Sequence, residues 1–341
     1  MIERKSIQNI FSPMRLWVRV PSVILILVWL LHPPAFGAEN NVFRTGLFNV
    51  KSGTVAVTPD GRALVFTTSH MPDGFRHLDL QTGQIRIINQ NSRRFWHDPR
   101  WSHDGRRLVV VSAGVDPKGY YQLNDTQIAL IDPRTWASRT LTQGNGVRLS
   151  PFFSNDGKTV YYFHAQIRER GMRPADNYDL YAIDLQNGVE KKITDEEFYK
   201  AMPGDMDGQG RILFTASVPS KHIPAPKKKD PWGLSASLLT PFKLDLQGGR
   251  ISEFLISTGG QIGNEFYIPR LDRLDNIYFK AAMANKSPFV YAIYKVDAFG
   301  KNLTELSRIV IGYEFDVAWR TGDVIMMDQQ GGELIFRGLF H

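Results

Sequence analysis

The chain of 341 residues contains no cysteine. This absence excludes disulfide bonds, thiolate-bound zinc or iron–sulfur clusters, a cysteine nucleophile and a lipid anchor on an N-terminal cysteine. The sequence also lacks the G-x-S-x-G elbow, the P-loop, the H-E-x-x-H motif and the G-x-G-x-x-G fingerprint. The eight histidines are scattered, and His97 and His103 are spaced unsuitably for one metal ion. We therefore predict no metal and no cofactor.

Long apolar runs are equally scarce. The run Val23–Leu31 follows Arg15 and Arg19 and precedes the small residues Ala35 and Gly37. A basic segment, a short apolar core and small residues at a cut are typical of a secretory signal. The run is shorter than a membrane span. Residues 1–37 are thus predicted to be a signal peptide, with Met14 as a second candidate start, and residues 38–341 to be a single domain in a bacterial periplasm. The alternative is an uncleaved signal that anchors the protein to the inner membrane.

The charge is only mildly positive. The formal net charge of +7 falls to +4 when residues 1–37 are removed, because they carry four basic residues and Glu3. Nucleic-acid binding usually requires a concentrated basic face. We therefore expect no nucleic-acid partner and, after processing, no stable membrane span.

A short repeated unit organises the rest of the chain. Apolar residues alternate, an Asp-Gly pair follows, and a second apolar run completes the unit. This pattern predicts two strands joined by a tight hairpin, since glycine accepts a positive φ and aspartate bonds the turn backbone. Three strong copies are "VAVTPDGRALVFTTS" from Val55, "PRWSHDGRRLVVVS" from Pro99 and "PFFSNDGKTVYYF" from Pro151, and three degraded copies begin at Gly204, Pro269 and Val317.

A more polar hairpin follows each of the first five copies, as in "DLYAIDLQNGVEKKIT" from Asp179. The glycines Gly61, Gly105, Gly157 and Gly210 lie 44, 52 and 53 residues apart. Four strands in each unit of this length predict an all-β, six-bladed β-propeller rather than a β-sandwich. The last unit lacks one strand, and we expect the segment 42–50 to supply it and close the ring.

The pattern P-x-W-S-x-D-G-R-x-L-x-V-x-S resembles the propeller repeat of TolB-like proteins. The resemblance covers nearly all of the predicted domain and implies a periplasmic six-bladed propeller. TolB itself carries an α/β domain before its propeller, and we expect that domain to be absent here. Most such propellers are binding modules, although similar ones occur in peptidases and sugar lyases.

Three long connections between the second and third strands are predicted to build up one face of the ring. They span 113–125, 164–178 and 217–240. Their basic and aromatic residues are of the types enriched at interfaces and suit an acidic partner. The loop-face candidates are Tyr120, Tyr121, Arg168, Arg170, Arg173, Tyr178, Lys227, Lys228, Lys229 and Trp232. The alternative is that these loops are merely solvated.

The mouth of the channel is a second candidate site. Polar residues near the start of the inner strands are placed to bind a small ligand, or else to pair with one another. They are His97, Asp98, Arg148, Glu265, Glu314 and Asp316.

Two functions are consistent with the sequence. The first is a monomeric, non-catalytic periplasmic propeller that binds a protein partner or an envelope polymer. The second is a lyase or hydrolase that acts on an acidic carbohydrate. We favour the first, because no pair of carboxylates stands out in the sequence as an acid and a base.

Overall fold

Every residue that the computed structural model describes lies in the unit Asn41–His341. The described ranges are 42–50, 52–68, 74–89, 93–167, 177–224, 238–260, 262–283, 290–310 and 314–340. Within these ranges all regular structure is β-strand. Nothing in the described part of the chain is a helix that is long and apolar enough to span a membrane.

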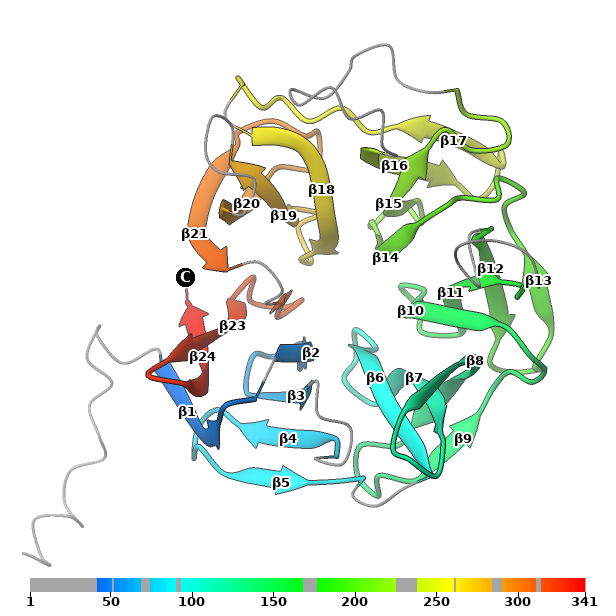
Figure 1. The fold of residues 1–341 in the computed structure, drawn as a ribbon. Coiled ribbons are helices and arrows are strands. Elements are labelled where there is room, and N and C mark those ends of the chain that lie inside the picture. The colour runs from blue at the N-terminus through cyan, green and yellow to red at the C-terminus, as the bar shows by residue number, and fades with distance from the viewer. Residues whose placement is uncertain are drawn as a thin grey trace, which may run out of the picture. The chain divides into compact units, whose positions relative to one another are not determined.

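Six four-stranded antiparallel sheets stand around a central axis, as the repeat predicts (Figure 1). The first strand of each blade lies nearest the axis and the fourth lies at the rim. Blade 1 holds β2 (Ser52–Val57), β3 (Ala63–Thr68), β4 (Arg76–Asp79) and β5 (Ile85–Ile87); blade 2 holds β6 (Arg94–Trp101), β7 (Leu108–Val115), β8 (Tyr121–Ile131) and β9 (Ser138–Thr140); blade 3 holds β10 (Val147–Phe153), β11 (Thr159–Ala165), β12 (Asp179–Asp184) and β13 (Glu190–Lys192).

The second half of the ring repeats this arrangement, including the blades built from degraded copies. Blade 4 holds β14 (Ala201–Met206), β15 (Ile212–Val218), β16 (Leu238–Asp245) and β17 (Arg250–Glu253); blade 5 holds β18 (Ile262–Leu271), β19 (Ile277–Met283), β20 (Val290–Val296) and β21 (Thr304–Val310); blade 6 holds β22 (Phe315–Val317), β23 (Val324–Gln330), β24 (Glu333–Leu339) and β1 (Val42–Phe48).

The Asp-Gly turns close the inner hairpins in the predicted way. In blade 2 the N–H of Gly105 donates to the carbonyl of Ser102 at 2.8 Å, and Gly105 has a φ of 73°. The carboxylate of Asp104 accepts the N–H of Arg106 at 2.9 Å. In blade 5, Asp275 adopts the corresponding left-handed conformation, with a φ of 61°. Aspartate tolerates this region better than most residues, so the degraded copy still forms its hairpin.

The N-terminal strand closes the ring, as the sequence predicts. β1 pairs with β24 in antiparallel register, with Val42 opposite Arg337 and Arg44 opposite Ile335. The Arg44 guanidinium donates to Glu333 at 2.7 Å, and Glu333 also accepts the N–H of Gly46 at 2.8 Å. The final blade is therefore shared by the two ends of the described chain.

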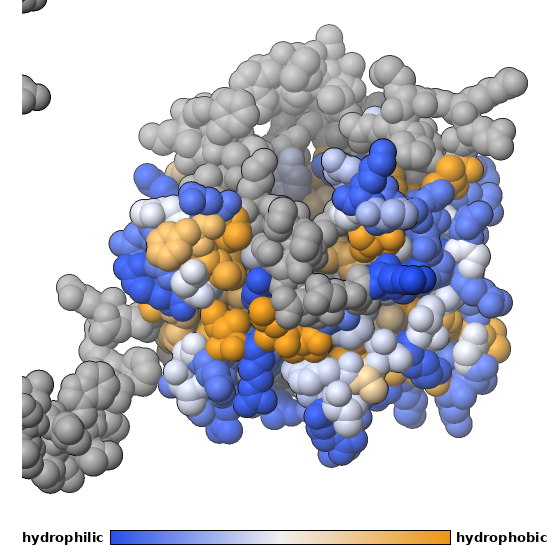
Figure 2. Space-filling view, turned by 60° about the horizontal axis from the view of Figure 1, so that its bottom comes forward, coloured by the Kyte–Doolittle hydropathy of each residue, from blue (hydrophilic) through white to orange (hydrophobic). Residues whose placement is uncertain are grey.

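Hydrophobic core lies between neighbouring blades. β7 and β15 are almost completely buried, whereas every residue of β9 and β13 is exposed. At the closure of the ring, the Phe66 and Phe336 rings meet edge-to-face with centroids 4.9 Å apart. Hydrophilic residues predominate on the side of the ring that Figure 2 shows, and hydrophobic residues gather in places among them. Each blade thus buries its faces against its neighbours.

Candidate functional site

Four charged side chains meet on the axis of the propeller and form a cluster of ion pairs. The Arg100 guanidinium donates to Asp316 at 2.8 Å and to Asp205 at 2.7 Å. Arg270 donates to the same oxygen of Asp316 at 2.6 Å. The four side chains are at most 13% exposed. Buried charges of this kind are tolerated when ion pairs and hydrogen bonds compensate them.

The cluster arises from one position of the repeat. In each of the four blades concerned, the charged residue stands two residues before the residue whose carbonyl accepts the N–H that closes the inner turn. In the other two blades this position holds apolar residues that belong to the hydrophobic core. Backbone groups complete the cluster, because the N–H of Val57 donates to Asp316 and that of Leu271 donates to Asp205. Burial lowers the pKa of Arg100, but Asp205 and Asp316 outweigh this effect and the net pKa is raised. The six residues at this position are Ala56, Arg100, Phe152, Asp205, Arg270 and Asp316.

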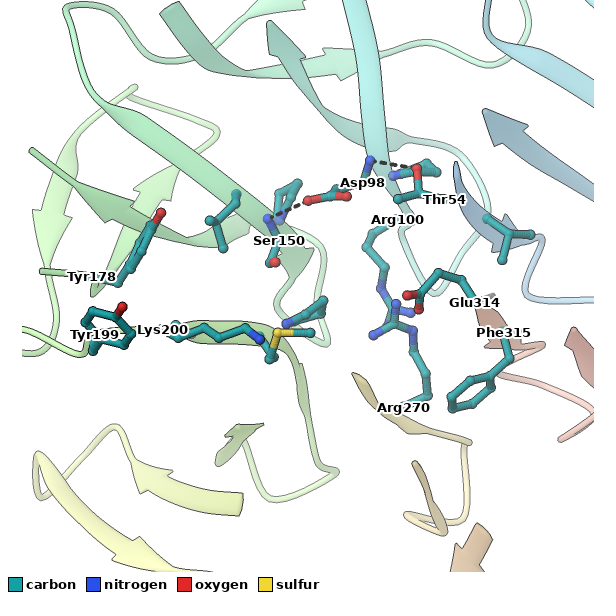
Figure 3. Close-up of a pocket in the computed structure, with 17 residues that line it drawn as sticks. Thr54, Asp98, Arg100, Ser150, Tyr178, Tyr199, Lys200, Arg270, Glu314 and Phe315 are labelled. Carbon is teal, nitrogen blue, oxygen red and sulfur yellow. Dashed lines mark hydrogen bonds between the residues drawn. The ribbon is translucent and has the colours of Figure 1, made fainter. Parts of the chain in front are cut away.

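A cavity of about 360 Å³ lies on the side of the cluster where the inner strands begin. A much smaller cavity of about 20 Å³ lies on the other side, and Arg100 borders both. The larger cavity is therefore a blind recess rather than part of an open channel. Polar side chains from several blades line it (Figure 3). They belong to Thr54, Asp98, Arg100, Ser150, Tyr178, Tyr199, Lys200, Arg270 and Glu314.

β-bulges in the inner strands shape the wall of this cavity, and those in β6 and β10 contain residues with a positive φ. The pairing register shifts between His97 and Arg100 in β6, and at the corresponding place in β10. There Asp98 and Ser150 have φ values of 47° and 56°. This conformation is strained for residues other than glycine, and both residues also precede prolines, which favour an extended neighbour. Bulges and strained residues of this kind are concentrated at functional sites.

The bulges also connect three blades. The N–H of Asp98 donates to the Thr54 hydroxyl at 3.0 Å, and the N–H of Ser150 donates to the Asp98 carboxylate at 3.3 Å. Blade 1 therefore holds the backbone of Asp98 at the cavity, and blade 3 holds its carboxylate. Such fixed polar groups are a property of preorganised binding sites.

Two carboxylates in the cavity have pKa values shifted in opposite directions. Burial raises the pKa of Asp98, but His97, 3.3 Å away, and the N–H of Ser150 outweigh burial and the net pKa is lowered. For Glu314, burial raises the pKa; Lys280, at 3.5 Å, opposes it, the negative charge of Asp98 reinforces it, and the net pKa is raised. Separated carboxylate pKa values suit either an acid–base pair or a site for a proton-donating ligand.

The opposite wall is aromatic and cationic. Tyr178 is 9% exposed and Tyr199 is 37% exposed. Reciprocal backbone hydrogen bonds join Tyr178 to Phe198, and these bonds hold the segment that leads into Lys200. The Lys200 ammonium lies 5.6 Å from the centroid of the Tyr267 ring. Lys200 extends into the cavity from one side, and Glu314 extends into it from the other, beside Arg100 and Arg270 (Figure 3).

The described ends of the long connections lie at the same end of the ring as the cavity. The start of each inner strand pairs with the end of the second strand, as in Arg94 with Gly114 and Ala201 with Ala216. The long connections therefore leave the blades at the same end as the cavity. Tyr178 lines the cavity, Tyr121 packs against His97 with ring centroids 5.7 Å apart, and Tyr120 is 69% exposed. The other loop-face candidates, Arg168, Arg170, Arg173, Lys227, Lys228, Lys229 and Trp232, lie outside the described residues.

The predicted channel-mouth residues do not all line the cavity. Asp98 and Glu314 line the cavity, and His97 supports Asp98. Arg148 instead donates to the carbonyls of Thr126, Gln143 and Gly144, and it lies outside the cavity lining. Asp316 belongs to the ion cluster. The side chain of Glu265 is outside the described residues.

Sequence reasoning missed several lining residues, above all Lys200, Tyr199, Ser150 and Thr54. One signal was available. Three copies of the repeat carry a proline directly before the position of Arg100, namely Pro99, Pro151 and Pro269, and the pairing register shifts around each of them. In blades 2 and 3 the residue before this proline lines the cavity. Among the described residues, no three histidine, aspartate or glutamate side chains are grouped to hold a metal ion.

Comparison with known proteins agrees with this geometry. No family model matches the chain. A protein TolB homolog from Chlorobium luteolum is 28% identical over 137 residues, which is 40% of this chain and 27% of that protein. Solved structures of a putative TolB from Agrobacterium tumefaciens and of TolB from Acinetobacter baumannii match with TM-scores of 0.55 and 0.56, each at 15% identity. They cover 85% and 87% of this chain and 90% and 65% of theirs. The chain is a six-bladed β-propeller that is similar in fold to these TolB structures and similar in sequence to part of the TolB homolog.

The TolB-like fold also occurs in an enzyme. An oligogalacturonate lyase from Vibrio parahaemolyticus matches with a TM-score of 0.53 at 13% identity, over 86% of this chain and 78% of the lyase. At such low identity the likeness establishes the fold alone. The chain spans little more than a quarter of the length of the curated TolB homolog, so the activity and partners of that protein are not carried over to this chain.

Proposed function

We propose that the propeller is a monomeric, non-catalytic binding module of the bacterial periplasm, which receives a protein partner or an envelope polymer at the cavity end of its axis. The observation that carries the proposal is the blind recess of about 360 Å³, closed beneath by the ion cluster. A recess with a fixed floor and polar walls suits insertion of part of a partner. The likeness to TolB and the signal-like N-terminal sequence support the periplasmic location.

The surroundings of the recess support a large partner. The connections between the second and third strands of blades 2, 3 and 4 leave at this end. The start of the blade 4 connection is held by an ionic network in which Asp195 pairs with Lys192 and Lys221, and Lys192 pairs with Asp179 at 3.0 Å. Functional loops on propellers are typically positioned by a rigid ring in this way. We propose that these loops extend the contact surface around the recess.

A capture experiment tests this function. The bait would be the purified propeller, crosslinked to an envelope extract, compared with Asp98→Asn/Lys200→Gln and with shortened 164–178 and 217–240 loops. The matched control is Asp156→Asn/Lys158→Gln, which changes the same residue types at an exposed turn on the opposite end. We expect the cavity and loop variants to lose a partner that the wild type and the control retain. Equal recovery by all variants would refute the proposal.

A second function, lysis or hydrolysis of an acidic carbohydrate, is favoured by one observation. Asp98 and Glu314 share the cavity with pKa values shifted apart, as an acid–base pair requires. Incubation with oligogalacturonate, followed by mass spectrometry, tests it. A product formed by the wild type and not by Glu314→Gln would support catalysis, and absence of product from the wild type would contradict it for this substrate.

A further inference from the structure

A basic groove lies at the opposite end of blade 2 from the cavity. It has a volume of about 360 Å³ and runs between the inner turn, which carries Arg106 and Arg107, and the outer turn and strand, which carry Arg134 and Arg139. Leu130 and Asp132 also line it. With four arginines against one aspartate among its charged residues, the lining has a formal charge of +3. The groove is distinct from the proposed recess and does not depend on its function.

Most of this positive charge is uncompensated. Within the described part of the chain, the guanidinium groups of Arg106, Arg107 and Arg139 donate no hydrogen bond and form no ion pair. Arg134 contacts Asp132 at 3.4 Å while remaining 88% exposed. The carboxylate of Asp104 lies outside the lining, and, against the raising effect of burial, the positive charges of Arg106 and Arg107 help to lower its pKa. The groove therefore presents several guanidinium groups to solvent.

The repeat provides an internal reference for these arginines. The pairing of Ala63 with Asp79 in blade 1 and of Thr159 with Asp184 in blade 3 places Ala63 and Thr159 where blade 2 has Arg107. Similarly, blade 1 has Gln81 where blade 2 has Arg134. The neighbouring blades thus form the same turns without these two arginines. Closing the turns does not explain why blade 2 has four.

Blade 1 does carry the other two arginines, but there they have partners. Arg62 lies 3.9 Å from Asp60, and Arg86 contacts the side-chain carbonyl of Gln84 at 3.5 Å. Blade 1 therefore serves as an internal control. It has arginines at the positions equivalent to Arg106 and Arg139, but none at the positions equivalent to Arg107 and Arg134. The difference between the blades is the clustering of four guanidinium groups around one groove.

We propose that this groove binds a phosphate-bearing ligand. Guanidinium groups bind phosphate oxygens through paired, charge-assisted hydrogen bonds, and a cluster of them favours a group with more than one negative charge. The apolar Leu130 at the groove suits the uncharged part of such a ligand. A soluble phosphorylated molecule and a phosphate headgroup on a membrane present the same chemistry.

Titration with inorganic pyrophosphate, followed by calorimetry at low ionic strength, tests the groove. The double variant Arg106→Gln/Arg139→Gln removes two exposed charges from it, and Arg62→Gln/Arg86→Gln removes two from the equivalent positions of blade 1. We expect the first variant to weaken binding by at least about tenfold, since charge-assisted hydrogen bonds are lost, and the second by less than about twofold. The substituted side chains are exposed, so the melting temperatures should stay unchanged. Arg107→Gln, which substitutes a partly buried lining residue, should weaken binding independently.

Vesicles that contain phosphatidylglycerol, compared with vesicles of phosphatidylcholine alone, distinguish the two sources of phosphate. Binding of pyrophosphate that the groove variant loses supports a soluble ligand. Sedimentation with the phosphatidylglycerol vesicles alone, lost in the same variant, supports a membrane headgroup. Equal weakening by both double variants, or no binding of either probe by the wild type, would overturn the proposal.

Discussion

The two ends of the propeller are built by different rules. At the turn end, most inner hairpins close in the same way. A residue in the left-handed conformation donates its N–H to the carbonyl of the residue three positions before it, and an aspartate carboxylate accepts an N–H of the turn in several of them. At the cavity end, no two blades present the same set of side chains. Thr54, Asp98, Ser150 and Glu314 come from four different blades. The repeated residues build the ring, and the residues that depart from the repeat build the recess.

The arginine groove sharpens this contrast, because it lies at the uniform end. Two of its arginines, Arg107 and Arg134, occupy positions at which blade 1 has Ala63 and Gln81, although the turns themselves are unchanged. A departure from the repeat is therefore a useful guide to function at either end. The following predictions test the contrast between residues that build the ring and residues that serve a site.

The largest loss of stability is expected at the ion cluster, which lies on the axis between the turn end and the cavity end. Asp316→Ala removes the acceptor of Arg100, Arg270 and the N–H of Val57. Breaking a buried ion pair leaves uncompensated charge, so we expect the free energy of unfolding to fall by about 3–5 kcal/mol. Chemical denaturation measures it. A loss of less than about 1 kcal/mol would show that water solvates the cluster and that the floor of the recess is open.

A smaller loss is expected at the turn end. Gly105→Ala places a side chain at a φ of 73°, where the nearest atom to the new carbon is 3.7 Å away, in Pro59. The cost is conformational rather than steric, and we expect a loss of about 1 kcal/mol. Gly210→Ala, at a φ of 76° and with nothing within 4 Å of the new carbon, is the matched position in blade 4, and it should give a similar loss. Unequal losses in thermal denaturation would contradict the view that this end is uniform.

The reverse substitution at the cavity end should stabilise the protein. Ser150 has a φ of 56°, so Ser150→Gly relieves strain, while the N–H that binds Asp98 is retained. Glycine gains from the left-handed conformation more than it loses in chain entropy, and the net gain is expected to be about 0.5 kcal/mol. Stabilisation together with weaker partner capture would mark a residue retained for function. Destabilisation would mean that the serine hydroxyl supports the fold.

The smallest effects are opposite pH dependences for the two cavity carboxylates. The pKa of Glu314 is raised in the folded protein, so its charged form opposes folding, and its destabilising effect appears as the pH rises from the unfolded pKa through the folded one. Glu314→Gln should therefore raise the melting temperature above that window relative to the wild type, and not below it.

For Asp98 the sign is reversed. Its lowered pKa means that the charged form stabilises the fold above the unfolded pKa, and that this contribution is lost as the pH falls through the folded pKa. Asp98→Asn should lower the melting temperature near neutral pH, with a difference that shrinks in acid. Thermal scans from pH 3 to 9 measure both variants. Parallel pH profiles for the two variants would contradict the separation of the two carboxylates.

Much of the cavity end was hidden from sequence reasoning for a physical reason. His97, Asp98 and Glu314 were found because they stand at the start of inner strands. Lys200 was missed, because it precedes a degraded copy and enters the recess from an adjoining connection. Arg148 has the same polar character as the lining residues, yet it binds backbone carbonyls instead. The direction of each side chain depends on the bulges, and the proline next to the bulge in three blades indicates where a bulge lies but not which way the neighbouring side chains point.

The sequence alone determined the six-bladed ring, its inner and outer hairpins and its closure by the segment 42–50. These features depend on local alternation, turn chemistry and repetition, which act within a few residues of one another. Only the tertiary structure decided that residues more than 200 positions apart, such as Arg100 and Asp316, meet on the axis. It also decided that the recess is blind and that four arginines share one groove. Contacts of this kind exist only after the ring has closed, because closure brings equivalent positions of separate blades to a common axis.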